Sequence, residues 1–121
     1  MTHSFDVAIL GAGIAGAGLA AALADSGISV ALIEPREPRA PAEAWDSRIY
    51  AISPGAVRFL DECGAWAGVD STRVARIDSM RVYGDHPSAS LRFSAFDAGL
   101  GELALIAEGG RVQHALWRRV T

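Results

Sequence analysis

The chain has 121 residues, of which 50% are hydrophobic and 21% are charged, as in an ordinary globular domain with a core of its own. Its formal net charge of −3 argues against nucleic acid or an anionic membrane as a partner. The single cysteine, Cys63, excludes an intramolecular disulfide and fits a reducing cytosol, and the three histidines are too scattered to form a metal site.

Residues 5–34 predict a strand, a glycine-rich turn, a helix and a second strand that ends on an acid. Phe5–Leu10 and Ser29–Ile33 are short apolar runs, as expected of strands that are buried on both faces. Between them, residues 11–16 carry the spacing G-x-G-x-x-G, and a run of good helix formers follows and stops at Gly27. The stretch therefore predicts a Rossmann-like βαβ unit.

Each glycine of the turn has a separate physical role in such a unit. Gly11 allows the tight turn out of the first strand, Gly13 lets a pyrophosphate approach the backbone, and Gly16 lets the helix lie close to the sheet. The pyrophosphate would bind at the helix N-terminus, where free N–H groups and the helix dipole favour an anion. The candidate cofactor-binding residues in this stretch are Gly11, Gly13, Ile14, Ala15 and Gly16.

Glu34 ends the second strand, and it follows the glycine turn by about twenty residues, the interval expected for an acid that binds a ribose hydroxyl. A carboxylate here would repel a 2′-phosphate, so the adenosine half should belong to FAD or NAD(H) and not to NADP(H). Residues 35–45 contain three prolines and predict a loop. Arg36 and Arg39 in this loop could contact adenine or ribose, but a solvated surface charge is the favoured interpretation of each. Pro35 and Arg36 are nevertheless kept as cofactor-binding candidates.

Two other interpretations of the N-terminal stretch are disfavoured. Residues 7–24 carry no charge and approach the length of a membrane span, but they are mostly Gly and Ala, and the acids Asp6 and Asp25 flank them without a basic anchor. A signal peptide is disfavoured because the first six residues carry no positive charge apart from the terminus. We therefore expect no transmembrane segment.

Asp46–Ser53 leads into a second helix. Ser53 is a good N-cap, Pro54 suits the first helical position, and the helix should end near Gly64. Arg48 is a charge in a segment that is otherwise largely apolar. Its guanidinium fits either a contact to phosphate or flavin or a surface salt bridge, and the spacing alone does not decide between them.

The last third of the chain predicts an antiparallel hairpin, a strand and a helix. Residues 84–88 form a turn between two segments whose apolar residues alternate with polar ones. The apolar residues are Ile77, Met80 and Val82 in the first segment and Leu91, Phe93 and Phe96 in the second. A short strand at 103–107, a turn at 108–110 and a helix from 111 to 121 follow, with Val112, Ala115 and Leu116 on one face of the helix.

Four segments of the chain together resemble a known family. They are DVAILGAGIAGAGLAAALADSGISVALIE, DSRIYAISPGAVRFLDECGAW, IDSMRVY and LGELALIAEGGRVQHALW. In order and spacing they resemble the N-terminal part of flavin-dependent aromatic hydroxylases of the ubiquinone-biosynthesis type, which are related in fold to para-hydroxybenzoate hydroxylase. The first segment is shared by many flavin and NAD proteins, whereas the second and fourth point to this group.

The resemblance implies FAD as the cofactor, NAD(P)H and O₂ as co-substrates, and hydroxylation of an aromatic ring, often that of a prenylated quinone precursor. It places Arg48 near the FAD pyrophosphate and flavin, and the segment 108–113 next to the flavin, which adds Arg111 to the candidates. Gly109 stands where the family usually has Asn, so a side-chain contact from this position is lost. The resemblance names no catalytic base, and it allows a cytoplasmic protein that associates with the membrane surface.

The predicted fold class is α/β, with a Rossmann-like FAD-binding βαβ core and an antiparallel β excursion. We expect residues 1–75 and 103–121 to form the FAD-binding part, and residues 76–102 to begin a substrate-binding sheet. The Asp-Gly and Gly-Asp segments found later in the family have no counterpart here, so we expect a truncated, N-terminal portion that is inactive alone. The alternatives are a stand-alone module that binds FAD or NAD, and an NAD-dependent oxidoreductase domain, for which further strand–helix units would be expected.

Overall fold

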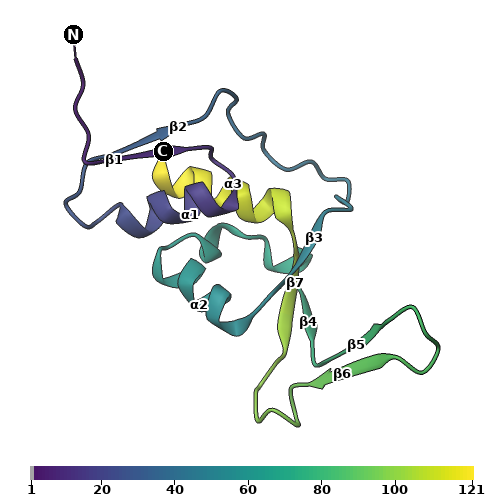
Figure 1. The fold of residues 1–121 in the computed structure, drawn as a ribbon. Coiled ribbons are helices and arrows are strands. Elements are labelled where there is room, and N and C mark those ends of the chain that lie inside the picture. Colours follow the sequence, from purple (N-terminus) through teal and green to yellow (C-terminus); the bar gives the residue numbers. More distant parts are fainter. Residues whose placement is uncertain (1) are drawn as a thin grey trace.

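The computed structural model describes residues 2–121, which form an α/β fold of three α-helices and three small sheets (Figure 1). The strands are β1 (Val7–Leu10), β2 (Val30–Ile33), β3 (Ile49–Ile52), β4 (Ala75–Ile77), β5 (Ser79–Tyr83), β6 (Ser90–Ser94) and β7 (Ala104–Glu108). The helices are α1 (Ile14–Leu23), α2 (Pro54–Glu62) and α3 (Gly109–Val120), with short 3₁₀ helices η1 (Trp66–Gly68) and η2 (Ser71–Arg73).

The N-terminal stretch forms the predicted βαβ unit. Strands β1 and β2 pair in parallel over all four residues of each strand. The Asp6 carboxylate fixes the start of this pairing, because it accepts hydrogen bonds from the Ser29 backbone N–H at 2.9 Å and from the Ser29 hydroxyl at 2.7 Å. Within residues 2–121, no helix combines the length and the apolar character that a membrane crossing requires.

A second sheet has the strand order β3-β7-β4, and both outer strands run antiparallel to β7. The sequence pattern predicts β7 but not β3, because it indicates for Ile49–Ile52 only a segment that leads into the second helix. Three of the four β3 residues are exposed and only Ile52 is buried, so the segment lacks the alternation that would mark a half-buried strand. Its pairing with β7 positions it, from more than fifty residues away along the chain: Ile49 lies opposite Glu108.

The hydrophobic core lies between the helices and the second sheet. Helices α1 and α3 lie side by side and run in the same direction (Figure 1). Their contact surfaces are built from small or well-buried residues, which lets the two backbones approach closely. These include Ala17 and Ala21 on α1 and Val112, Ala115 and Leu116 on α3, which confirms the predicted buried face of the last helix.

Helix α2 begins and ends as predicted. The Ser53 hydroxyl accepts a hydrogen bond from the Ala56 N–H at 3.3 Å, and Pro54 occupies the first turn. The helix gives way to Gly64, whose φ of +78° is a conformation that favours glycine. The predicted turn at 108–110 is wrong, because β7 runs directly into α3 at Gly109 without an intervening turn.

The β5–β6 hairpin forms a third sheet and projects away from the helices (Figure 1). Two residues assigned to it from the sequence lie elsewhere. Ile77 belongs to β4 and pairs with Ala104 of β7, and Phe96 follows β6 in a turn where it is 91% exposed. Only Asp78 separates the end of β4 from the start of β5, and the alternation of apolar and polar residues does not reveal this break. The division of the chain into two units stays a prediction.

Candidate functional site

The three glycines of the turn after β1 are held by different constraints. Gly11 has a φ of +97°, and its N–H donates to the Ile33 carbonyl at 2.8 Å, so the turn closes against β2. A Cβ on Gly16 would lie 1.9 Å from the Gly11 carbonyl oxygen, which only a residue without a side chain avoids. Gly13 has no heavy atom within 4 Å of a Cβ position. Packing therefore explains Gly16, whereas the bare backbone at Gly13 is left open to a ligand.

The carboxylate of Glu34 connects the end of β2 to the glycine turn. It accepts hydrogen bonds from the backbone N–H groups of Ala12 at 2.8 Å and Arg36 at 3.1 Å. The hydrogen bond from Ala12 is the main reason that the pKa of Glu34 is lowered, with that from Arg36 second. Two carboxylate oxygens offer about four acceptor positions, so Glu34 retains capacity for a ribose hydroxyl. Pro35 and Arg36 follow it on the exposed surface.

The N-termini of α1 and α3 meet at a cavity of about 210 Å³. It is lined by Gly13, the N-cap of α1, and Ile14, and by Gly109 and Gln113 of α3. Neither helix has a side-chain cap or an acidic residue in its first turn, so backbone N–H groups and two helix dipoles are available to an anion. The Gln113 amide donates to the Ala12 carbonyl at 2.8 Å and joins α3 to the glycine turn.

Arg48 lies at the rim of this cavity. The structure thus brings it to the same place as Gly13, although 34 positions of sequence separate the two. Its Nη2 atom is 3.2 Å from the Asp46 carboxylate, and the side chain is 81% exposed. An exposed pair of this kind contributes little to stability, so the guanidinium can turn toward a phosphate at small cost. Its backbone carbonyl accepts a hydrogen bond from the Gly109 N–H at 2.8 Å.

Arg111 has a different environment from the other candidates. Its Nε donates to Glu108 Oε2 at 2.8 Å, and its Nη2 donates to the Ala42 carbonyl at 2.9 Å. The side chain is 14% exposed, and its guanidinium is directed to these partners. The structure therefore gives Arg111 an internal role, and its predicted contact with the cofactor stays a prediction.

Glu108 is the centre of a buried ion cluster. The residue is 2% exposed, and Arg73 approaches it with both Nε and Nη2, at 2.9 and 2.8 Å. The hydrogen bond from Arg73 is the main reason that the pKa of Glu108 falls to about 2; the Asp46 backbone N–H and Arg111 lower it further. A buried carboxylate with this many donors stays ionised at neutral pH.

The ion cluster holds the loop between β2 and β3. Glu108 accepts a hydrogen bond from the Asp46 N–H at 2.8 Å, and Arg73 donates to the Glu43 carbonyl at 2.8 Å. The Arg73 guanidinium also lies 3.6 Å from the centre of the Trp45 ring, a cation–π contact. Because Asp46 and Arg48 follow directly along the chain, this cluster determines where Arg48 meets the cavity.

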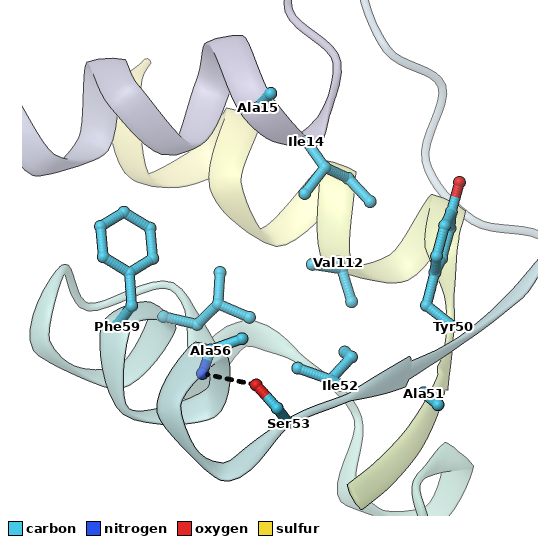
Figure 2. A pocket seen from close by; sticks show the side chains of 10 residues that line it. Ile14, Ala15, Tyr50, Ala51, Ile52, Ser53, Ala56, Phe59 and Val112 are labelled. Carbon is cyan, nitrogen blue, oxygen red and sulfur yellow. Dashed lines mark hydrogen bonds between the residues drawn. The ribbon is translucent and has the colours of Figure 1, made fainter.

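A larger apolar cavity of about 560 Å³ is also lined by Ile14. It is lined by residues of α1, β3, α2 and α3, and Figure 2 shows Ile14, Ile52, Phe59 and Val112 around it. Tyr50 stands at one end, with its hydroxyl directed away from Ile52 (Figure 2). Ile14 and Tyr50 line both cavities, so the apolar one adjoins the cavity at the two helix N-termini.

Sequence reasoning missed several residues of this site. Tyr50, Gln113, Glu108 and Arg73 were not candidates, because their partners lie far away along the chain. The sequence does carry a signal for α3: residues 103–107 form an apolar run, and two glycines follow Glu108, which repeats the strand–glycine–helix order of the N-terminus. That repetition marks a second helix N-terminus in the sequence.

Comparisons with known proteins find similarity to flavoproteins and to ubiquinone hydroxylases. The family of FAD dependent oxidoreductases matches residues 6–56, which include the glycine turn, Glu34 and Arg48. The chain is 34% identical over 116 residues to 3-demethoxyubiquinol 3-hydroxylase of Escherichia coli, and 32% identical over 116 residues to ubiquinone hydroxylase UbiL of Rhodospirillum rubrum. These alignments cover 93% and 95% of this chain but 29% and 27% of the two relatives. The chain therefore spans less than a third of their length.

A solved structure is also similar to this chain. A mutant of PqsL from Pseudomonas aeruginosa, a probable FAD-dependent monooxygenase, aligns with a TM-score of 0.66 and 25% identity, over 96% of this chain and 30% of PqsL. These similarities confirm the resemblance to FAD-dependent hydroxylases, the α/β fold class with a Rossmann-like core, and FAD as the cofactor of the family that matches. The roles of individual residues stay predictions.

Proposed function

We propose that this chain is the part of an FAD-dependent monooxygenase that holds the pyrophosphate and adenosine of FAD, and that the whole protein hydroxylates an aromatic ring. The observation that carries the proposal is the meeting of two uncapped helix N-termini and Arg48 at one cavity beside the open backbone of Gly13. A dianionic pyrophosphate needs such a concentration of N–H donors and positive charge.

The residues present fit this cofactor. Gly13 leaves room for the phosphates, the first turns of α1 and α3 supply donors, and Arg48 adds an exposed guanidinium. Glu34, anchored by Ala12, has spare acceptor capacity for the ribose. FAD, when bound, supplies the redox chemistry that activates O₂, while the protein binds and orients the reactants. In this mechanism the described residues position the cofactor, and none of them is assigned as a general base.

The relatives suggest the class of substrate. Two curated relatives are named for hydroxylation in ubiquinone chemistry, so we propose an aromatic quinone precursor as the substrate, with O₂ and NAD(P)H as co-substrates. A substrate of that kind would bring the whole protein to the membrane surface from the cytoplasm. Because the chain spans less than a third of these relatives, we expect it to bind cofactor without turning over a phenol.

The first test is a titration of the purified chain with FAD and, separately, with NAD, followed by flavin fluorescence and by thermal shift. The decisive variant is Gly13→Val. The structure leaves space for the new side chain, so the fold should survive while the side chain blocks the approach of the phosphates. Gly55→Val is the matched control, because a Cβ at Gly55 also meets no atom within 4 Å and Gly55 of α2 does not line the cavity at the two helix N-termini.

We expect saturable FAD binding that weakens at least about tenfold in Gly13→Val, a loss of about 1.4 kcal/mol, and stays unchanged in Gly55→Val. Equal FAD affinity in wild type and Gly13→Val would contradict the proposed site. Binding of NAD without FAD would instead favour the NAD-dependent oxidoreductase, the alternative that Glu34 also permits.

A further inference from the structure

We propose that Tyr50 is a specificity-determining residue of the cofactor site. Its side chain contacts the flavin ring of FAD and makes no contact with the adenosine half. The inference rests on the proposed function and extends it to a residue that neither the glycine motif nor the acid at the end of β2 marks.

The Tyr50 ring is seated directly on Gly109. A Cβ on Gly109 would lie 2.3 Å from Cε2 and 2.9 Å from Cδ2 of the ring, and 3.4 Å from the Arg48 carbonyl. Any side chain at position 109 would therefore have to displace an aromatic ring. Gly110, the next residue, meets nothing closer than 3.7 Å. The need for glycine is thus specific to position 109, and it arises from Tyr50.

The backbone around this contact is fixed on both sides. Tyr50 pairs with Ala107 in the β3–β7 ladder, and the Gly109 N–H continues the same ladder by donating to the Arg48 carbonyl at 2.8 Å. The ring accordingly stands at the junction of β3, β7 and α3, where neither strand can shift without breaking the ladder. A ring held in this way presents its free side to the cavity at little cost in conformational entropy.

The exposed part of the Tyr50 side chain faces two cavities that are large enough for a ligand. Tyr50 and Ile14 line both the 210 Å³ cavity at the helix N-termini and the 560 Å³ apolar cavity. The residue is 53% exposed, and its hydroxyl has no hydrogen-bond partner among residues 2–121. A half-exposed aromatic ring beside an apolar cavity and an unpaired hydroxyl suits a heteroaromatic ring with polar edges.

The direction of the ligand is inferred from which residues line the cavities. Gly13 and Arg48 place the phosphates in the smaller cavity, and Glu34 lies outside both cavities, beyond Ala12. The adenosine that Glu34 binds must therefore extend away from Tyr50. The other half of the dinucleotide, the flavin ring of FAD, extends toward Tyr50.

The first experiment tests, without any cofactor, whether the Tyr50 ring packs on Gly109. We expect Gly109→Ala to lower the thermal unfolding midpoint of the chain, whereas Gly110→Ala, its matched control, leaves the midpoint nearly unchanged. The double variant Tyr50→Ala with Gly109→Ala should recover most of the loss, because the added methyl group then has space. Two outcomes would show that the Tyr50 ring does not pack on Gly109. One is an equal decrease of the unfolding midpoint in Gly109→Ala and Gly110→Ala, and the other is no recovery of the midpoint in the double variant.

The second experiment measures the affinities of Tyr50→Ala, Tyr50→Phe and wild type for FAD and for ADP. We expect Tyr50→Ala to weaken FAD about three- to tenfold, the effect of one aromatic contact, and to leave ADP within about twofold. Tyr50→Phe should retain most of the FAD affinity because it keeps the ring. Equal losses for FAD and ADP, or none for either, would refute the role of Tyr50 and leave the proposed function standing. If the wild-type chain binds neither FAD nor ADP, the proposed function and the proposed role of Tyr50 are both wrong.

Discussion

At the residue scale, two glycines of the same turn, Gly13 and Gly16, have different physical roles. Gly16 is required by packing, since a Cβ would overlap the Gly11 carbonyl, whereas Gly13 is required by nothing within the fold. The motif treats the two alike, but the structure separates a glycine that keeps the chain folded from one that leaves room for a ligand. That distinction yields a prediction that needs no cofactor.

We expect Gly16→Ala to destabilise the chain by about 1–3 kcal/mol or more, because the helix must move away from the glycine turn to admit a methyl group at 1.9 Å. Gly13→Ala is the control and should change stability by less than about 0.5 kcal/mol, since its Cβ meets open space. Urea unfolding followed by circular dichroism measures both. Similar stability of the two variants would mean that the turn is more adaptable than its geometry indicates.

At the element scale, the β2–β3 loop is ordered by a carboxylate that belongs to another element. Glu108 ends β7, yet it accepts the N–H of Asp46, and through Arg73 and Arg111 it fixes the carbonyls of Glu43 and Ala42. The loop itself has no regular structure, so its conformation depends on this buried cluster. Because the cluster requires an ionised carboxylate, the order of the loop is linked to pH.

The pKa of Glu108 in the folded chain is about 2, below its ordinary value of 4.5. Ionised Glu108 therefore stabilises the folded state fully above pH 4.5, and this stabilisation is lost as pH falls toward 2. We expect Glu108→Gln to be less stable than wild type at pH 7 in urea unfolding, and the difference to shrink over that acid range. Glu62→Gln, at an exposed position in α2, is the control and should follow wild type. A constant difference between pH 7 and pH 3 would contradict the ionic origin.

The elements that local patterns could predict are those whose determinants are close together along the chain. The βαβ unit, the capped α2 and the buried face of α3 follow from glycine spacing, a Ser-Pro start and helical periodicity, and the structure confirms them. Strand β3 was missed because β7 makes it a strand, with Ile49 opposite Glu108. The Tyr50–Gly109 contact and the Glu108 cluster escaped for the same reason, since tertiary packing alone brings those residues together.

At the scale of the whole molecule, the chain consists of a helical body and a projecting hairpin. The two faces of the β5–β6 hairpin differ: Met80 pairs with Phe93 and Val82 with Leu91 on one face, and Arg81 pairs with Arg92 on the other. Val82, Leu91 and Phe93 are nonetheless between 47% and 64% exposed. An amphipathic hairpin with an uncovered apolar face supports the proposal that residues 76–102 begin a sheet whose other strands lie outside this chain.

The hairpin can be removed without cutting the body, because its two ends meet. The Ala95 N–H donates to the Asp78 carbonyl at 2.9 Å, so a short Gly-Ser linker can join these residues in place of 79–94. We expect the shortened chain to keep the thermal unfolding midpoint and the FAD affinity of the full chain, and to aggregate less, since the exposed apolar face is gone. Differential scanning fluorimetry, an FAD titration and light scattering measure the three.

The control for this deletion is Leu91→Ser in the full chain, which makes the apolar face more polar and leaves the backbone in place. It should reduce aggregation as the deletion does, because Leu91 is 64% exposed and contributes little to the core. If the deletion unfolds the body or abolishes FAD binding while Leu91→Ser does neither, the hairpin is part of the cofactor-binding unit. In that case the proposed division at residue 76 is wrong, and the body depends on β5 and β6.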